Sequence, residues 1–245
     1  MAAGLICMLH LGRAGSTVLG DLLNQNPYVS WDAEIYGPMR KLWNGEGDPV
    51  QLMLARAAKV QHGLYGFEFK AYHALLVKRT LADMIGAYRD AGVDRFIVLR
   101  RENSLRKVAS TAVARITGRF HRTGTSAPPA QPDKPTRIRI DPEAHFIDSE
   151  TRPLVEFLDG FDRFFDELDG LLDQSEVLKL TYEGDIAEDP QVAYRKVCRW
   201  LNIAPHPVTM RFAVTTPFPL REVIDNYDEV ARALRGTKWE WMLEG

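Results

Sequence analysis

A glycine-containing loop near the N-terminus carries the residue types of a phosphate-binding site. The loop, Gly12-Arg13-Ala14-Gly15-Ser16-Thr17, follows an apolar run at residues 5–9 and opens a helix-like segment at residues 17–25. Such a loop aims backbone N–H groups and the positive end of a helix dipole at one point, where they can bind a phosphate. The phosphate loop of nucleotide hydrolases reads Gly-x4-Gly-Lys-Ser/Thr, and that lysine is missing here. We expect Arg13 to supply the cation instead, across the bond between a phosphate and the group being transferred.

Two further blocks place polar residues where a strand ends. The apolar run at residues 95–99 leads into Arg100-Arg101-Glu102-Asn103, and the leucine, valine and alanine that follow have helical spacing. Near the C-terminus, residues 177–183 read Val-Leu-Lys-Leu-Thr-Tyr-Glu and precede Asp189-Pro190, an N-cap followed by proline at the first helical position. Each block therefore predicts a strand that leads polar groups toward a helix.

Together the three blocks resemble the sulfotransferases that use 3′-phosphoadenosine 5′-phosphosulfate (PAPS), most nearly the bacterial carbohydrate and lipid sulfotransferases. Gly-Arg-Ala-Gly-Ser-Thr and Leu-Arg-Arg-Glu-Asn-x-Leu-Arg-x3-Ser are similar to the family's two phosphosulfate-binding motifs. The Tyr-Glu, Asp-Pro and Leu-Asn-Ile segments follow the order of the family's third block, so the resemblance spans most of the chain. It implies a P-loop-like nucleotide site, PAPS as co-substrate, the nucleotide PAP as product, and no requirement for a metal.

The resemblance assigns the nucleotide to three parts of the chain. The glycine loop would hold the 5′-phosphate, and Arg101 with Ser110 would hold the 3′-phosphate. Arg100 is the alternative to Arg101, because neighbouring residues at a strand end point opposite ways. The closing segment at residues 235–238 would help to cover the nucleotide. The implied cofactor-binding residues are Arg13, Ala14, Gly15, Ser16, Thr17, Arg101, Ser110, Thr237 and Lys238.

Transfer of a sulfonyl group to a hydroxyl needs a base, in-line alignment, and neutralisation of the leaving phosphate. Relatives of this type carry a catalytic glutamate after the second strand, where this chain has Glu34, with Asp32 as its nearest rival. Some relatives also place a lysine and a catalytic histidine two residues apart at the end of the third strand, whereas Lys70 and His73 are three apart. The expected catalytic residues are Arg13, Glu34 as the base with His73 as the alternative base, and Lys70 as a second cation.

The elements that must position these residues alternate between buried strands and helices. Near-continuous apolar strands are typical of a parallel sheet with helices on both faces, where ligands bind beyond the carboxyl ends of the strands. We therefore predict an α/β fold, a single domain over residues 1–245, with a central parallel sheet of about five strands. The expected strands are residues 5–9, 28–31, 64–70, 95–99 and 177–182, and the expected helices are residues 17–25, 50–60, 79–90, 103–118, 152–172 and 190–201.

The composition limits which binding partners and which cellular compartment we expect for the chain. The chain has 245 residues, 45% of them hydrophobic, and a net charge of −2, so no global excess of positive charge favours nucleic acid. Its two cysteines make no disulfide framework, and its apolar start is too short to span a bilayer. We expect a cytoplasmic protein without a transmembrane segment, acting on a small-molecule, carbohydrate or lipid acceptor whose identity the sequence does not specify.

A proline-containing segment at residues 121–148 interrupts the alternation of strands and helices. Its prolines prevent a regular helix or central strand, and its length is unusual for a connection inside a compact domain. It also carries Lys134, Arg137 and Arg139 just after the second phosphate motif. We predict a mobile lid over the acceptor site, with a surface insertion as the alternative.

Two other functions remain open from the sequence. The first is a P-loop kinase, against which stand the missing loop lysine and the lack of a clear acidic strand end for magnesium. The second is a nucleotide-binding module without catalytic activity, against which Glu34 and Lys70 argue mildly. Turnover without a metal would distinguish a sulfotransferase from the kinase, and PAP binding without turnover would favour the inactive module.

Overall fold

The computed structural model describes residues 4–37, 41–121, 123–124, 130–147 and 150–244. The chain divides into two compact units. The first comprises Met1–Arg100 and Asp166–Val208, and the second comprises Arg101–Phe165 and Thr209–Gly245. That residues 1–245 act as one domain stays a prediction.

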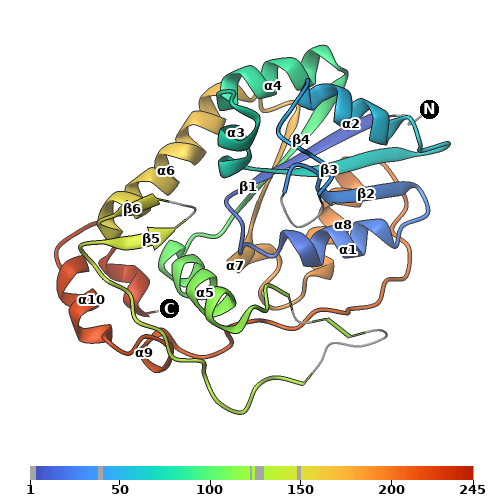
Figure 1. Cartoon of the computed structure of the whole chain (residues 1–245). Helices are drawn as coiled ribbons and strands as arrows, with labels where there is room; N and C mark the ends of the chain where they lie inside the picture. The colour runs from blue at the N-terminus through green and yellow to red at the C-terminus, as the bar shows by residue number, and fades with distance from the viewer. Residues whose placement is uncertain (1–3, 38–40, 122, 125–129, 148–149, 245) are drawn as a thin grey trace. The chain divides into compact units, whose positions relative to one another are not determined.

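The first unit is built on a five-stranded parallel sheet, in the order β2-β3-β1-β4-β7 (Figure 1). Its central strands are almost wholly buried, as expected for apolar runs covered on both faces. The predicted α/β fold with a parallel sheet is therefore confirmed. The strands are β1 (Gly4–His10), β2 (Val29–Glu34), β3 (Leu64–Lys70), β4 (Val93–Arg100) and β7 (Val177–Thr181).

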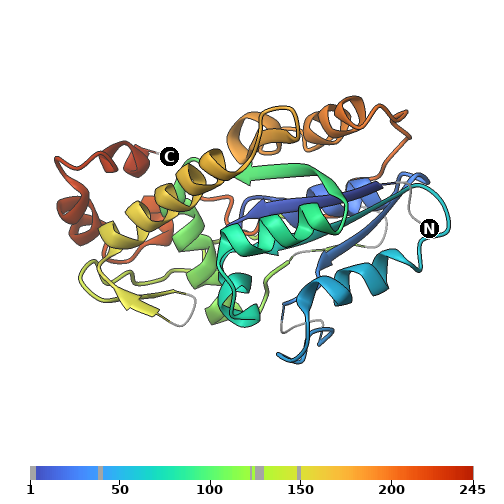
Figure 2. The ribbon, with the colours of Figure 1, turned by 90° about the horizontal axis from the view of Figure 1, so that it is seen from above.

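Helices cover both faces of this sheet. Figure 1 shows α2 (Pro49–Ala57), α3 (Ala71–Val77) and α4 (Leu81–Asp90) above the strands, and α1 (Ser16–Asn24) with α8 (Gln191–Trp200) below them. Figure 2 agrees, since α2 and α4 lie nearest the viewer when the molecule is seen from above. This division follows from right-handed crossover connections between the parallel strands. Connections that add strands toward one edge of the sheet place their helices on one face, and connections that add strands toward the other edge place theirs on the opposite face.

The sequence missed two short helices of the first unit. The helix expected at residues 79–90 is confirmed as α4, which begins at Leu81 after its N-cap Thr80, but α3, directly after β3, was not expected. A four-residue helix, α7 (Tyr182–Asp185), follows β7, with the Thr181 side chain accepting the Gly184 N–H. Elements this short show too few turns for hydrophobic periodicity to reveal them.

The second unit contains α5 (Ser104–Thr117) and a set of short elements. Helix α6 (Leu154–Leu171) begins in this unit and ends in the first. Its apolar stripe is buried, including Phe157, Phe161 and Phe165. In the described part of the chain, no helix is both long and apolar enough to cross a membrane. The remaining elements are β5 (His145–Ile147), β6 (Glu150–Arg152), α9 (Leu220–Val223), α10 (Tyr227–Leu234) and the 3-10 helix η1 (Glu240–Glu244).

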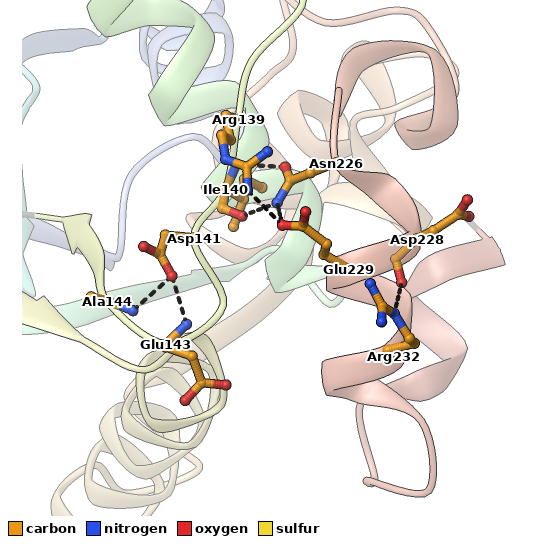
Figure 3. A network of polar contacts seen from close by, with 9 residues as sticks. All are labelled: Arg139, Ile140, Asp141, Glu143, Ala144, Asn226, Asp228, Glu229 and Arg232. Atoms are coloured by element: carbon orange, nitrogen blue, oxygen red, sulfur yellow. Dashed lines mark hydrogen bonds and ion pairs between the residues drawn. The ribbon is translucent and has the colours of Figure 1, made fainter.

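Part of the predicted loop at residues 121–148 forms hydrogen bonds and an ion pair with the C-terminal segment of the second unit. The Asn226 side chain accepts the Ile140 N–H at 3.1 Å and donates to the Ile140 carbonyl at 2.6 Å (Figure 3). Arg139 pairs with Glu229 at 2.7 Å, and Ile138 is buried. Residues 122, 125–129 and 148 of the loop lie outside the described residues. That the loop acts as a lid stays a prediction.

Candidate active site

The glycine loop between β1 and α1 adopts a backbone that favours glycine. The φ angles of Gly12, Arg13 and Gly15 are 81°, 56° and 86°. A Cβ at Gly15 would lie 2.8 Å from Ile186 Cγ2, so a side chain there meets both strain and a steric clash. Arg13 adopts the left-handed region without being glycine, a conformation typical of functional loops. The loop geometry is thus specific, and Gly15 can be replaced only at a cost.

The first turn of α1 is open to an anion. Its N-cap is Gly15, which provides no side-chain hydrogen bond, and the turn contains no acidic residue. Ser16 is buried and Thr17 is half-buried. The backbone N–H groups at a helix start need an acceptor, and the helix dipole favours a negatively charged one. The arrangement is able to bind a phosphate.

Lys70 connects this loop with Glu34. Glu34 ends β2 and Lys70 ends β3, the neighbouring strand, and Lys70 Nζ lies 2.5 Å from Glu34 Oε1. A Cβ at Gly12 would lie 3.4 Å from Lys70 Cε, so the lysine side chain packs directly against the loop. A cation and a carboxylate therefore lie together beside the glycine loop, at the carboxyl edge of the sheet.

His73 faces Glu34 from the first turn of α3. Its Nδ1 accepts the Lys70 N–H at 3.1 Å, and its Nε2 lies 3.7 Å from Glu34 Oε2. That separation is too long for a hydrogen bond but short enough for an electrostatic contact. The ring is fully buried against Tyr36 and Phe69. Because Nδ1 is an acceptor, the proton of the neutral ring is on Nε2 and points toward Glu34.

The environment fixes the charges of this pair. Burial alone would raise the pKa of Glu34, but His73 and the positive charge of Lys70 lower it more, to well below its ordinary value. Burial is also the largest influence on His73 and lowers its pKa, although Glu34 acts in the opposite direction. At neutral pH the carboxylate is therefore charged and the imidazole neutral.

The residues assigned to the 3′-phosphate lie in the second unit. Arg101 is buried, directly after β4. Ser110 is buried in α5, with its Oγ 3.3 Å from Thr215 Oγ1. The start of α5 is capped, because the Asn103 side chain accepts the Arg106 N–H. Arg100, the alternative residue, ends β4 in the first unit.

Thr237 makes local contacts near the C-terminus, and Lys238 pairs with residues of α6. The Thr237 hydroxyl donates to the Leu234 carbonyl at 2.7 Å and accepts the Trp239 N–H at 3.2 Å. Lys238 forms ion pairs with Asp159 and Asp162 at 3.3 and 3.2 Å. These contacts give both residues a structural role, and their part in binding a nucleotide stays a prediction.

A second polar cluster in the first unit was missed by the sequence analysis. His10 and Glu68 lie in β1 and β3, with His10 Nε2 3.2 Å from Glu68 Oε2, and Trp31 Nε1 donates to Glu68 Oε1 at 3.1 Å. A signal was present, because Glu68 stands between Phe67 and Phe69 in an otherwise apolar strand. Among the described residues, no group of three or more His, Cys, Asp or Glu side chains is arranged to hold a metal ion.

Comparisons with known proteins bear on the fold alone. No protein-family model matches the chain, and no curated protein matches it. Among solved structures, a sulfotransferase from Alicyclobacillus acidocaldarius matches with a TM-score of 0.50 and 11% sequence identity. The match covers 99% of this chain and 96% of that one. At this identity, what the two chains share is the α/β fold.

Proposed function

We propose that this protein is a sulfotransferase that moves a sulfonyl group from PAPS to a hydroxyl of a carbohydrate, glycolipid or other small acceptor. The observation that carries the proposal is the position of Lys70, which packs on the glycine loop and pairs with Glu34. A phosphate-binding loop, a cation and a carboxylate within contact distance are the groups that this transfer requires. The fold shared with a solved sulfotransferase is consistent with it.

The residues of the loop fit the 5′-phosphosulfate end of PAPS. The positive φ angles at Gly12, Arg13 and Gly15 and the uncapped start of α1 provide backbone donors for a phosphate. A larger residue at Gly15 would clash with Ile186, 2.8 Å from the position of its Cβ, and so disturb the loop. Arg13, half-exposed within the loop, would neutralise the leaving phosphate.

Three residues of the chain have separate roles in the proposed transfer. Bound PAPS supplies the sulfonyl group: the acceptor oxygen bonds to sulfur, the bond from sulfur to the 5′-phosphate oxygen breaks, and PAP keeps that electron pair. Glu34 takes the proton of the acceptor hydroxyl. Lys70 and Arg13 stabilise the negative charge that develops on the transferred group and on the phosphate.

The geometry favours Glu34 over His73 as the base. His73 Nδ1 is already occupied by the Lys70 N–H, and its Nε2 carries the proton, so the neutral ring has no free acceptor for another proton. Its role is to orient Glu34. Glu34 is charged but a weak base while Lys70 is paired with it. Movement of Lys70 onto the sulfonyl group would raise the pKa of Glu34 at the moment when a base is needed.

Incubation with PAPS and a panel of hydroxyl acceptors, followed by mass spectrometry, tests the proposal. We expect a product heavier by one sulfate, formed equally with and without a metal chelator. Phosphorylation by magnesium-ATP would instead assign a kinase, and PAP binding without turnover over a broad panel would assign an inactive nucleotide-binding module.

Thermal shift with PAP and AMP tests the nucleotide. The sequence resemblance assigns the 3′-phosphate to Arg101 and Ser110, and charge-assisted hydrogen bonds of this kind should make PAP stabilise the protein more than AMP does. Equal stabilisation by both nucleotides would remove the basis for PAPS. Arg101→Ala should abolish the preference for PAP while retaining the response to AMP.

A further inference from the structure

The buried cluster of His10, Glu68 and Trp31 ends on the glycine loop. His10 is the last residue of β1, and its Nδ1 accepts the Gly12 N–H at 3.0 Å. Gly12 begins the series of positive φ angles in the loop, and Lys70 packs against it. The imidazole therefore holds one specific backbone amide, at the point where the chain leaves the sheet to form the loop.

The proton on the His10 ring is specified by its surroundings. Because Nδ1 accepts a hydrogen bond from Gly12, the proton of the neutral ring must lie on Nε2. Nε2 faces Glu68 Oε2 at 3.2 Å, and both side chains are almost fully buried, at 0% and 2% exposure. An anionic carboxylate beside Nε2 stabilises the tautomer with Nε2 protonated.

Trp31 fixes the other oxygen of the carboxylate. Its indole Nε1 donates to Glu68 Oε1 at 3.1 Å. Two glycines leave space for the indole: a Cβ at Gly66 would lie 2.2 Å from the ring, and a Cβ at Gly20 would lie 2.6 Å from Nε1. Glu68 thus has a hydrogen-bond donor on Oε1 and the His10 ring within ion-pair distance of Oε2, and the two glycines leave room for this arrangement.

We propose that His10 is a positioning residue for the phosphate-binding loop, and that Glu68 and Trp31 hold its ring in the tautomer that accepts the Gly12 N–H. The cluster is buried, and it acts through Gly12 on the directions of the loop amides that would bind phosphate. With Nδ1 protonated, the ring would present a donor to the Gly12 N–H, and the peptide would have to turn away. The nucleotide arm of the test rests on the proposed function, and the spectroscopic arm does not.

The pair His10→Asn and His10→Gln separates positioning from packing. Asparagine places an oxygen near the position of Nδ1 and can still accept the Gly12 N–H, whereas glutamine reaches toward the position of Nε2. Both variants disturb the contact with Glu68, so both should lower the melting temperature. We expect His10→Gln to weaken PAP binding about tenfold in calorimetry, and His10→Asn to remain within about threefold of the wild type, the scale of one lost hydrogen bond. His62→Gln, an exposed histidine, is the control.

Nitrogen-15 NMR of the full chain reads the tautomer directly, without any nucleotide. We expect His10 to show a protonated Nε2 and an unprotonated Nδ1, and Glu68→Gln to alter that pattern, because one amide group cannot accept from both Trp31 and His10. A wild-type ring protonated on Nδ1, or on both nitrogens, would overturn the proposal. So would equal losses of PAP affinity in the two His10 variants. A wild type with the expected tautomer that fails to bind PAP would count against the proposed function and leave the tautomer assignment standing.

Discussion

Two histidine–glutamate pairs lie side by side in the first unit, and they are built alike: Glu34 and Glu68 are on the adjacent strands β2 and β3, while His10 ends β1 and His73 is in α3. In each pair the histidine Nδ1 accepts a nearby backbone N–H, from Lys70 for His73 and from Gly12 for His10. In each pair Nε2 faces a glutamate oxygen, at 3.7 and 3.2 Å respectively. The two glutamates, Glu34 and Glu68, are register partners across β2 and β3.

The pairs differ in burial and in the third partner of the carboxylate. The Glu34 side chain is 23% exposed and pairs with Lys70, a flexible cation. The Glu68 side chain is 2% exposed and accepts from Trp31, a rigid donor. A buried carboxylate held by a rigid indole and an adjacent buried imidazole keeps its partners, whereas a half-buried one paired with a lysine on a flexible stem can exchange them. Under the proposed function, the same pair of residue types serves the reaction in one place and positions the loop in the other.

The largest expected effect is on turnover at the half-buried pair, Glu34 and His73. Glu34→Gln removes the proposed base while keeping the size of the side chain, and we expect turnover with PAPS to fall about a hundredfold or more, the usual scale for a general base. PAP affinity in calorimetry should stay near that of the wild type. Glu46→Gln, in an exposed loop, is the matched control. Near-normal turnover in Glu34→Gln together with lost turnover in His73→Ala would reassign the base to His73.

For the buried pair, His10 and Glu68, the expected effect is on the free energy of unfolding. Glu68→Gln turns an NH2 group toward either Trp31 or His10, so one buried donor loses its acceptor at a cost of about 2 kcal/mol. Glu34→Gln leaves Lys70, the charged partner, in reach of water and should change the free energy of unfolding by less. Urea denaturation of both variants measures the contrast. Equal destabilisation would mean that burial does not distinguish the two pairs.

The difference in the free energy of unfolding between the wild type and Glu68→Gln should also depend on pH. Burial would raise the pKa of Glu68, but the hydrogen bond and charge of His10 lower it overall. A carboxyl whose pKa is lower in the folded state than in the unfolded state stabilises the protein above the unfolded value, near 4.3. The advantage of wild type over Glu68→Gln should therefore be full at neutral pH and shrink as the pH falls below about 4.

The local parts of this site could be predicted from the sequence, and the non-local parts could not. The glycine loop was predictable because strand, glycines and helix are contiguous. The proximity of Glu34 and Lys70 follows from the rule that parallel strands present their carboxyl ends at one edge. The spacing of Lys70 and His73, which departs from that of relatives, corresponds to the first turn of α3, which brings Nδ1 back to the Lys70 N–H.

The cluster around His10 depends on information that no single segment carries. It requires the strand order β2-β3-β1 and a register that sets Glu34 beside Glu68. Pairing between strands far apart in sequence is decided by the packing of the whole sheet. No single stretch of residues therefore determines the strand order or the pairing register. A charged residue inside an apolar strand was the available signal.

Lys70→Met tests whether the lysine sets the pKa of Glu34. Loss of the positive charge removes one of the influences that lower this pKa, so the pKa should rise toward its ordinary value. The carboxylate then protonates at higher pH, and the acid limb of kcat/KM should move to higher pH. We also expect turnover at neutral pH to fall about tenfold, because a cation on the transferred group is lost. Lys59→Met, an exposed lysine after α2, should leave the profile unchanged, and an unmoved acid limb in Lys70→Met would exclude this role.

The smallest effect concerns the rigid donor of the buried pair, and the chain offers a matched comparison for it. Trp31 Nε1 donates to Glu68, whereas the buried Nε1 of Trp43 finds no acceptor among the described residues. Trp31→Phe and Trp43→Phe remove the same atoms, but only the first leaves a buried carboxylate oxygen without its donor. We expect Trp31→Phe to be the more destabilising of the two by about 1 kcal/mol in urea denaturation. If Trp43→Phe cost as much, the loss would belong to the indole volume, and Trp31 would be a packing residue rather than a support for Glu68.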